Sequence, residues 1–243
     1  MKKVIIIPAR HASSRFPGKP LAMIGGKTMI ERVVAQCLMV NGVDDVIVAT
    51  DHVHIAGMAN SAGALSAITG IHHSGSDRVA EAARQQNLDD NDIVVNVQGD
   101  VPFISPRLIE QLIDEIVGHD HYDIVTAARK RDDTNGFYDK NNVKVVIDRK
   151  GKALSFTRTP FYAERNGDGT WLNHIGIYAY RNSSLQRFVN TPQSQLEKKE
   201  KLEQLRVIYE DFYIHVAISQ FDCGVDVNTP EDLVMANKMT LCE

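Results

Sequence analysis

The order of apolar and polar positions predicts alternating strands and helices in the N-terminal half of the chain. Three short, almost wholly apolar runs predict strands of a sheet that is buried on both faces: 3–9, 44–50 and 92–100. Three longer segments predict helices, the last with Ser105 as N-cap: 28–40, 53–61 and 105–117. This alternation predicts an α/β fold with a mostly parallel, Rossmann-like sheet flanked by helices.

From Asp123 onward the pattern changes to longer strands. Three segments predict them, the second as a hairpin that turns at "DRKGK": 123–130, 141–160 and 174–181. The remaining segments predict a helix, a strand and a closing helix capped by Thr229: 196–210, 213–220 and 229–239. Because no repeat, low-complexity tract or linker divides the chain, we expect one domain over residues 1–243 with a β-rich insertion at about 123–190.

The composition of the 243 residues argues against several classes of function. A net charge of -4 leaves no global basic field of the kind that holds nucleic acid or an anionic membrane. No stretch reaches the roughly 18 apolar residues of a membrane span. Cys37, Cys223 and Cys242 are widely spaced without a CxxC pair, which predicts reduced thiols in the cytoplasm rather than zinc or disulfides. Because the net charge is negative, a site for an anionic ligand must depend on a local cluster of cations.

A cluster of cations follows the first predicted strand directly. The stretch "IIIPARHASSRFPGKPL", residues 5–21, carries Arg10, Arg15 and Lys19 among small residues. Small residues let the backbone approach an anion, and guanidinium groups bind phosphate oxygens in pairs. A charged surface loop is the alternative interpretation. The "GGKT" at 25–28 lacks the earlier glycine of a Walker P-loop, so a phosphate cradle here would be of a different kind.

Two carboxylates can complement this loop. Asp100 follows a predicted buried strand and a glycine, at the edge of the sheet where α/β folds bind ligands. Asp226 stands in the small-residue loop "GVDVNTPED" before the closing helix. A lone aspartate in such a place is typical of a helix cap or a turn, but Mg²⁺ binds through one or two carboxylates together with substrate phosphates. The two aspartates and the cationic loop predict metal-assisted attack on a phosphoanhydride.

These motifs resemble one family from end to end. In chain order they are "IIPARHASSRFPGKPL", "VATD", "HSGSDR", "VNVQGD", "NNVKVV", "HIGIY", "LEQLR" and "VDVNTPEDL". The sequence is similar to CMP-KDO synthetases, the 3-deoxy-manno-octulosonate cytidylyltransferases. The resemblance implies that the anomeric hydroxyl of an eight-carbon keto-acid sugar attacks the α-phosphorus of CTP and pyrophosphate leaves, for lipopolysaccharide biosynthesis. It also implies a cytoplasmic homodimer that associates through residues 145–180.

The resemblance assigns roles to individual residues. Those it implies to be catalytic are Arg10, Arg15, Lys19, Asp100 and Asp226, of which the two aspartates would bind Mg²⁺. Those it implies to bind the nucleotide are Pro8, Ala9, Arg10, Ser13, Arg15, Lys19, Ser74, Gly75, Ser76, Arg78 and Gln98. Those it implies to bind the sugar are Arg158, which would hold the carboxylate, His174, Tyr178, Glu203 and Gln204. Two have structural alternatives: Ser76 can cap a helix through Ala83, and His174 can be a buried histidine with satisfied hydrogen bonds.

Three features depart from the family pattern. Val101 follows "VQGD" where the family has Glu, Asn173 precedes "HIGIY" where it has Arg, and segment 159–173 is short. They lie near the sugar side or the metal, so both KDO and its 8-amino-8-deoxy analogue are candidate substrates. The missing arginine favours an ammonium group in the pocket, whereas the missing glutamate disfavours it. A sialic acid cytidylyltransferase, another sugar nucleotidyltransferase of this fold and a non-catalytic nucleotide-binding protein are the alternative functions.

Overall fold

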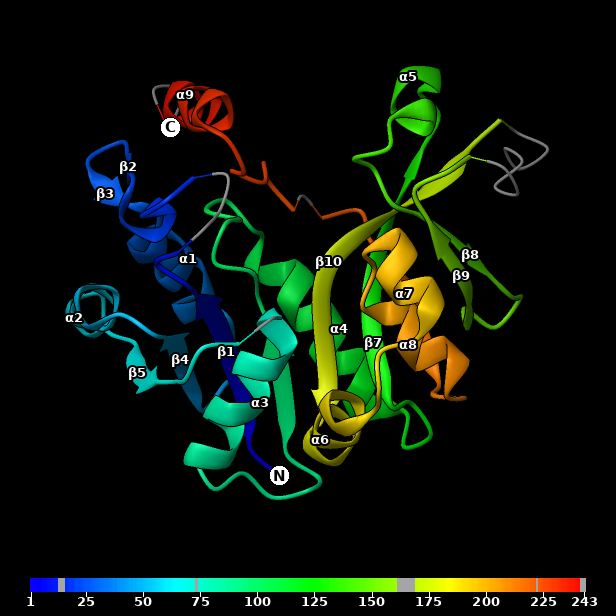
Figure 1. Ribbon diagram of the computed structural model, residues 1–243, viewed down its shortest axis with the longest axis horizontal. Coiled ribbons are helices and arrows are strands. Elements are labelled where there is room, and N and C mark those ends of the chain that lie inside the picture. The colour runs from blue at the N-terminus through cyan, green and yellow to red at the C-terminus, as the bar shows by residue number, and fades with distance from the viewer. Residues whose placement is uncertain (13–15, 73, 161–168, 222, 241–243) are drawn as a thin grey trace.

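The structure, a computed structural model, describes residues 1–12, 16–72, 74–160, 169–221 and 223–240. A nine-stranded mixed sheet forms its centre (Figure 1). The strands follow the order β11-β7-β10-β6-β1-β4-β5, and β8 pairs with β10 and β9. None of the helices in the described ranges is long and apolar enough to span a membrane.

The N-terminal half of the sheet is parallel. Its strands, in spatial order, are β6 (Ile93–Asn96), β1 (Lys3–Ala9), β4 (Asp45–Thr50) and β5 (Leu65–Ile68). Four helices flank them: α1 (Met29–Leu38), α2 (Val53–Ser61), α3 (Gly75–Gln85) and α4 (Pro106–Gly118). Alternate residues of β1 face opposite cores, because Ile5 and Ile7 pack in the cluster with α1 and α4, and Ile6 packs in the cluster with α3. Helices therefore cover both faces, as predicted.

The C-terminal half joins this sheet through one antiparallel strand. Its strands are β7 (Ile124–Arg131), β8 (Lys144–Ile147), β9 (Ala153–Thr157), β10 (Trp171–Arg181) and β11 (Ile214–Ile218). The long strand β10 runs antiparallel to both β6 and β7, and its register with β7 shifts between Ile175 and Tyr178. The predicted hairpin is confirmed as β8 and β9. The segment 123–190 also contains α5 (Thr134–Tyr138) and α6 (Asn182–Asn190).

Short elements at the two ends of the chain meet beside the first loop. The loop after β1 leads into a 3-10 turn, η1 (Lys19–Leu21), and a small two-stranded sheet, β2 (Met23–Ile24) and β3 (Lys27–Thr28). The chain beyond β11 crosses the top of the sheet in Figure 1 and ends in α9 (Pro230–Met239). Thr229 caps α9, as predicted, and Ala236 of α9 shares a core cluster with Ile24 and Met29.

Two local predictions were wrong. The helix predicted over 196–210 is two helices, α7 (Gln195–Glu200) and α8 (Gln204–Tyr209), because Lys201 adopts a left-handed conformation with φ 54° and ends the first helix. Ser76 does not cap a helix. Ser74 is the N-cap of α3, and its hydroxyl accepts a hydrogen bond from the N–H of Asp77.

Candidate active site

Lys19 stands at the centre of the site, at the start of η1. Gly18 before it has φ 70°, a turn that glycine adopts without strain, and its N–H donates to the carbonyl of His11 across 3.0 Å. This turn brings the Lys19 ammonium to 2.7 Å from Oδ2 of Asp100 and 3.5 Å from Oδ1 of Asn228. Three loops, which follow β1, β6 and β11, therefore converge on one ammonium group.

Backbone contacts hold the two predicted metal ligands in neighbouring loops. Gly99 packs so closely on β1 that a Cβ there would lie 2.8 Å from the carbonyl oxygen of Pro8. The N–H of Val227 donates to the carbonyl of Asp100 across 2.9 Å, which ties the Asp226 loop to the Asp100 loop. Asp226 is open to the cavity, but protein atoms crowd its carboxyl group. This crowding and the negative charge of Asp100 raise the pKa of Asp226 to about 6.

The donor set fits a hard divalent cation. Asp100 and Asp226 supply oxygen atoms, and both line the same cavity. Within the described ranges there is no cluster of three or more His, Cys, Asp or Glu side chains that could hold a metal ion by itself. Mg²⁺ commonly binds through two carboxylates and completes its shell with water and substrate phosphates. The residues therefore fit Mg²⁺ better than a metal held wholly by protein.

A first cavity, the loop cavity, collects most of the predicted nucleotide ligands. It has a volume of about 250 Å³. The predicted residues that line it are Pro8, Ala9, Arg10, Lys19, Ser74, Gly75, Arg78 and Gln98. Asp100 and Glu203 line it as well. Ser13 and Arg15 lie outside the described residues, so their assignment stays a prediction.

Arg78 lines the loop cavity and forms a partly buried ion pair. Its side chain is 3% exposed, and its guanidinium donates to Oδ2 of Asp51 at 2.8 Å and to the hydroxyl of Thr69. Asp51 also accepts a hydrogen bond from the N–H of His11, at 3.2 Å. The pKa of Asp51 is lowered because the hydrogen bond from His11 and the charge of Arg78 outweigh its burial. Arg78 therefore positions the cationic loop through Asp51, a residue of the "VATD" motif to which the sequence reasoning gave no role.

A second cavity, the tyrosine cavity, contains three of the predicted sugar ligands. It measures about 220 Å³ and is lined by Tyr178, Glu203 and Gln204, and also by Ser76 and Gln98. Burial raises the pKa of Glu203, and it raises that of Tyr178 well above the usual tyrosine value. The cavity has mostly neutral hydrogen-bonding groups, which suit sugar hydroxyls.

Tyr180 is a further polar group of the tyrosine cavity that sequence reasoning missed. It is 2% exposed and interacts with Ser76 and Asn96 through its hydroxyl. Side chains alternate between the two faces of a strand, so Tyr178 and Tyr180 of β10 point to the same face. This spacing in the sequence could have placed Tyr180 beside the predicted sugar ligand Tyr178.

A third cavity, the arginine cavity, lies beside the two predicted metal ligands. It measures about 450 Å³ and includes Asp100, Asp226, Val101, Arg129, Arg131, Asn142, Asn173 and His174 in its lining. His174 Nε2 is 2.9 Å from the hydroxyl of Thr126, and burial lowers the pKa of His174 to about 3. His174 is therefore neutral at physiological pH. Gln98 lines all three cavities and marks the place where they meet.

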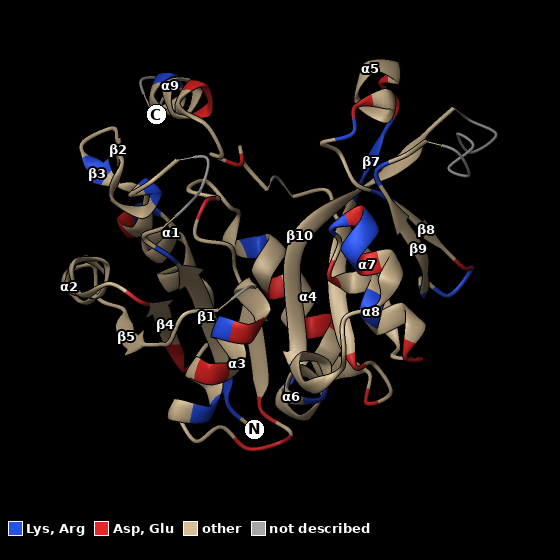
Figure 2. Ribbon diagram, viewed as in Figure 1, with Lys and Arg blue, Asp and Glu red and all other residues tan. Residues whose placement is uncertain are grey.

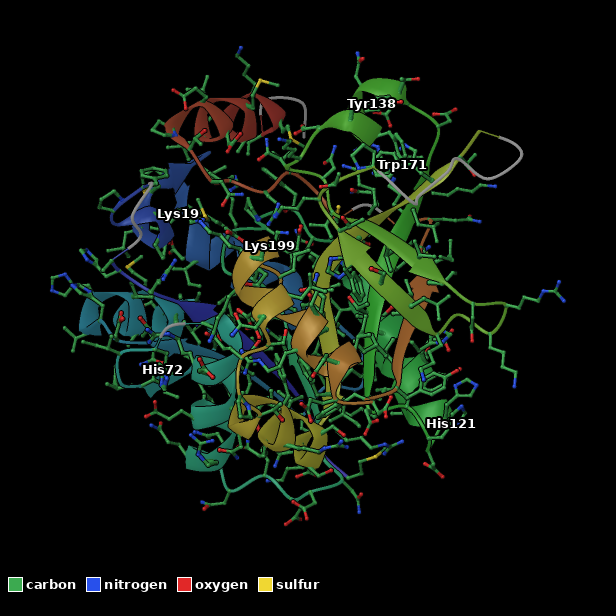
Figure 3. The ribbon with its side chains drawn as sticks, turned by 45° about the vertical axis from the view of Figure 1, so that its right-hand side comes forward. Lys19, His72, His121, Tyr138, Trp171 and Lys199 are labelled. Carbon is green, nitrogen blue, oxygen red and sulfur yellow. The ribbon has the colours of Figure 1, made fainter. Side chains whose placement is uncertain are left out.

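Arg158 lies apart from the other predicted sugar ligands. Its guanidinium donates to the backbone carbonyls of Lys140 and Glu200, at 3.1 and 3.3 Å. It lines none of the three cavities. Its assignment to the sugar carboxylate stays a prediction, and in this structure its donors connect the end of α7 to the loop after α5. In Figure 3, Lys19 lies on the side of the N-terminal half and Trp171 on the side of the C-terminal strands.

Comparison with known proteins agrees with this geometry. The profile of the cytidylyltransferase family matches residues 4–218. The 3-deoxy-manno-octulosonate cytidylyltransferase of Syntrophobacter fumaroxidans is 45% identical, over 96% of this chain and 94% of its own. The 8-amino-3,8-dideoxy-manno-octulosonate cytidylyltransferase of Shewanella pealeana is 43% identical, over 96% of both chains. A solved structure of CMP:2-keto-3-deoxy-manno-octonic acid synthetase complexed with CTP has a TM-score of 0.92 and 35% identity, over 100% of this chain and 99% of that one.

The fold and the sequence matches are those of a nucleotidyltransferase. The chain belongs to the cytidylyltransferase family, in the group of the 3-deoxy-manno-octulosonate cytidylyltransferases. The resemblance seen in the sequence motifs and the predicted fold class are thereby confirmed.

Proposed function

We propose that this chain transfers CMP from CTP to the anomeric hydroxyl of an eight-carbon 3-deoxy-octulosonate sugar and releases pyrophosphate, in lipopolysaccharide biosynthesis. The sugar is KDO or its 8-amino-8-deoxy analogue, the two that appear in the names of the relatives. The observation that carries the proposal is the meeting of Lys19, Asp100 and Asp226 at the edge of the sheet, beside the point where the three cavities join.

The first loop holds the triphosphate in this proposal. Arg10 and Lys19 line the loop cavity, and Arg15 belongs to the same loop. Their positive charges offset the charge that builds up on pyrophosphate as it leaves, and fixed charges do this without reorganisation. Gln98 and Ser74, which line the same cavity, provide both donors and acceptors for the edge of a cytosine ring.

Asp100 and Asp226 would hold the magnesium ion. When bound, Mg²⁺ would lower the pKa of the attacking sugar hydroxyl and offset charge on the phosphates. Asp100 would accept from Lys19 at Oδ2 and bind the metal through its other oxygen atom, and the phosphates of CTP would give the Lys19 ammonium a second anionic partner.

The tyrosine cavity would take the sugar hydroxyls. Tyr178, Glu203 and Gln204 line it next to Gln98, and so next to the nucleotide. Because His174 is neutral, it would serve as a hydrogen-bonding group beside Tyr178 rather than as a cation. Catalysis then rests on positioning and on electrostatic stabilisation.

The test is pyrophosphate release with each of the four nucleoside triphosphates against a panel of sugars. The panel contains KDO, 8-amino-KDO, a sialic acid and an aldose 1-phosphate. We expect turnover with CTP and one or both octulosonates, and a fall of at least about a hundredfold in Asp100→Ala and Asp226→Ala. Asp114→Ala, at an exposed position of α4 outside the three cavities, is the matched control and should keep full activity. Turnover with another nucleotide or sugar, or an unchanged Asp100→Ala enzyme, would refute the proposal.

Comparing kcat/KM for KDO and 8-amino-KDO decides between the two sugars. Similar values would show that the pocket is not specialised for either sugar.

We further propose that the enzyme is a cytoplasmic homodimer that associates through residues 145–180. Sedimentation equilibrium should give twice the mass of 27.0 kDa. A monomer would refute that part of the proposal and leave the reaction untouched.

A further inference from the structure

Two residues face each other where β7 and β10 enter the arginine cavity. Asn173 of β10 and Arg129 of β7 are direct partners in the antiparallel register, and Trp171 and Arg131 are the next pair on the same face. Direct partners place their Cβ atoms about 5 Å apart. Arg129, Arg131 and Asn173 all line the arginine cavity. Figure 2 shows the basic stretch at the end of β7, just below α5.

The neighbouring cations in this region have structural partners. Arg131 donates to both carboxylate oxygens of Asp133, at 2.7 and 2.9 Å, and lies over the ring of Trp171. Lys144, the partner of Asn173 on its other side in β8, is fully buried. Its ammonium donates to the carbonyls of Asp139, Asn142 and Arg158. Arg131 and Lys144 therefore have structural roles, whereas Arg129 is distinguished by its position, as the direct partner of Asn173 that lines the cavity.

Asn173 has an unmet acceptor in this setting. Its Oδ1 atom is buried and has no hydrogen-bond partner among the described residues. An unpartnered buried acceptor is destabilising, so such atoms commonly mark a place where a ligand or water binds. The side chain also sits between two cations, Arg129 on one side and Lys144 on the other. An uncharged residue fits there, because like charges on directly paired positions destabilise a sheet.

We propose that Arg129 and Asn173 together determine specificity for the acid end of the sugar. The guanidinium of Arg129 donates to the sugar carboxylate in place of Arg158, which donates to two backbone carbonyls and lines none of the three cavities. Oδ1 of Asn173 accepts a hydrogen bond from a hydroxyl beside that carboxylate. The ligand is thus a hydroxy acid, recognised through one anionic and one donor group. This inference rests on the proposed function and names the residues that read the acceptor sugar in it. Position 173 lacks a positive charge, and Arg129 of β7 supplies one to the same cavity.

The first experiment measures steady-state kinetics of Arg129→Ala. We expect KM for the sugar to rise about ten- to a hundredfold, the range of one charged hydrogen bond, with KM for CTP unchanged. The matched control is Lys130→Ala, because Lys130 is the next residue of the strand, points to the other face and lines none of the three cavities. Its sugar KM should equal that of the wild type. Arg129→Gln and a circular dichroism spectrum separate loss of the charge from loss of the fold.

The second experiment replaces the sugar carboxylate by a carboxamide. Wild-type enzyme should prefer the acid, and Arg129→Ala should lose most of that preference.

The third experiment moves the positive charge from position 129 of β7 to position 173 of β10. Arg129→Asn should raise the sugar KM, and adding Asn173→Arg in the same chain should restore most of the affinity, since both positions line one cavity.

The outcomes separate this inference from the proposed function. If Arg129→Ala keeps the wild-type sugar KM and the wild-type preference for acid over amide, the inference is wrong although the enzyme still makes CMP-sugar. If the double variant stays as impaired as Arg129→Asn, the shared site is wrong. If the wild-type chain does not use CTP with an octulosonate at all, the proposed function itself fails.

Discussion

The ammonium of Lys19 lies 2.7 Å from a carboxylate oxygen of Asp100, although 81 positions separate them in the chain. Lys19 therefore offsets the negative charge of a predicted metal ligand. Because like charges repel, an ammonium beside this carboxylate weakens the binding of a metal ion to it. The phosphates of CTP can accept hydrogen bonds from the Lys19 ammonium, which couples the binding of CTP to the binding of the metal ion.

Replacing Lys19 tests this coupling. Without nucleotide, Lys19→Met should bind Mn²⁺ about three- to tenfold more tightly than the wild type, because Asp100 loses its competing cation. The variant's kcat/KM should fall by about a hundred- to a thousandfold, as when one charge stabiliser is removed from a transition state. Electron paramagnetic resonance of free Mn²⁺ measures the affinity. Lys27→Met, on the exposed strand β3, is the control. Unchanged Mn²⁺ affinity would contradict the competition.

The raised pKa of Asp226 predicts how stability depends on pH. Its folded-state pKa of about 6 lies above the unfolded value, so its protonated form favours the folded state. This contribution is complete below about pH 4 and is lost as the pH rises through 6. Solvent screening of this open carboxyl keeps the effect to about 1 kcal/mol or less. Urea unfolding at pH 5 and 7.5 should therefore show Asp226→Asn gaining on the metal-free wild type as pH rises. A pH-independent difference would rule this out.

A buried ion pair supports the loop that carries Glu203 and Gln204. Arg206 of α8 donates to both carboxylate oxygens of Glu197 in α7, at 2.6 and 2.8 Å, and both side chains are at most 5% exposed. Glu197→Gln leaves a buried guanidinium without its counter-ion, so unfolding free energy should fall by about 3–5 kcal/mol. Asp120→Asn breaks the exposed pair with Arg181 and should have little effect in the same urea titration.

Two glycines should respond to alanine with opposite signs. Gly99→Ala places a Cβ 2.8 Å from the Pro8 carbonyl, so the Asp100 loop or β1 must shift. We expect a loss of about 1–3 kcal/mol in unfolding free energy and a higher KM for CTP. Gly57, within α2, has no atom within 4 Å of such a Cβ among the described residues. Gly57→Ala should stabilise the protein by about 0.5–1 kcal/mol. Equal effects at the two positions would contradict the packing argument.

Sequence periodicity predicted the elements that lie in the core and failed where a single residue changes the path of the chain. The strand at Lys3–Ala9 and the helix at Pro106–Gly118 have continuous or periodic apolar positions, which specify them locally. The break at Lys201 has no glycine or proline to signal it. It follows from the packing of α7 against α8 through the Glu197–Arg206 pair, which the linear pattern does not show.

The same distinction applies to the site. Lys19, Asp100 and Asp226 were predictable because strand ends in an α/β sheet converge at one edge. The role of Asp51 depends on its contacts with Arg78 and the backbone of His11, and these become visible only in the fold. Likewise, the sequence shows Asn173 as a missing positive charge, whereas the strand register places Arg129 directly beside it.

By itself, the sequence determined the family, the order of most strands and helices, and which loops carry the charged groups, because these depend on residue types close together in the chain. Only the tertiary structure decided which charges meet and which are already neutralised: Lys19 with Asp100, Arg78 with Asp51, and Arg158 with two backbone carbonyls. The reason is that electrostatic interactions depend on distances of a few ångströms between atoms, which chain position does not specify.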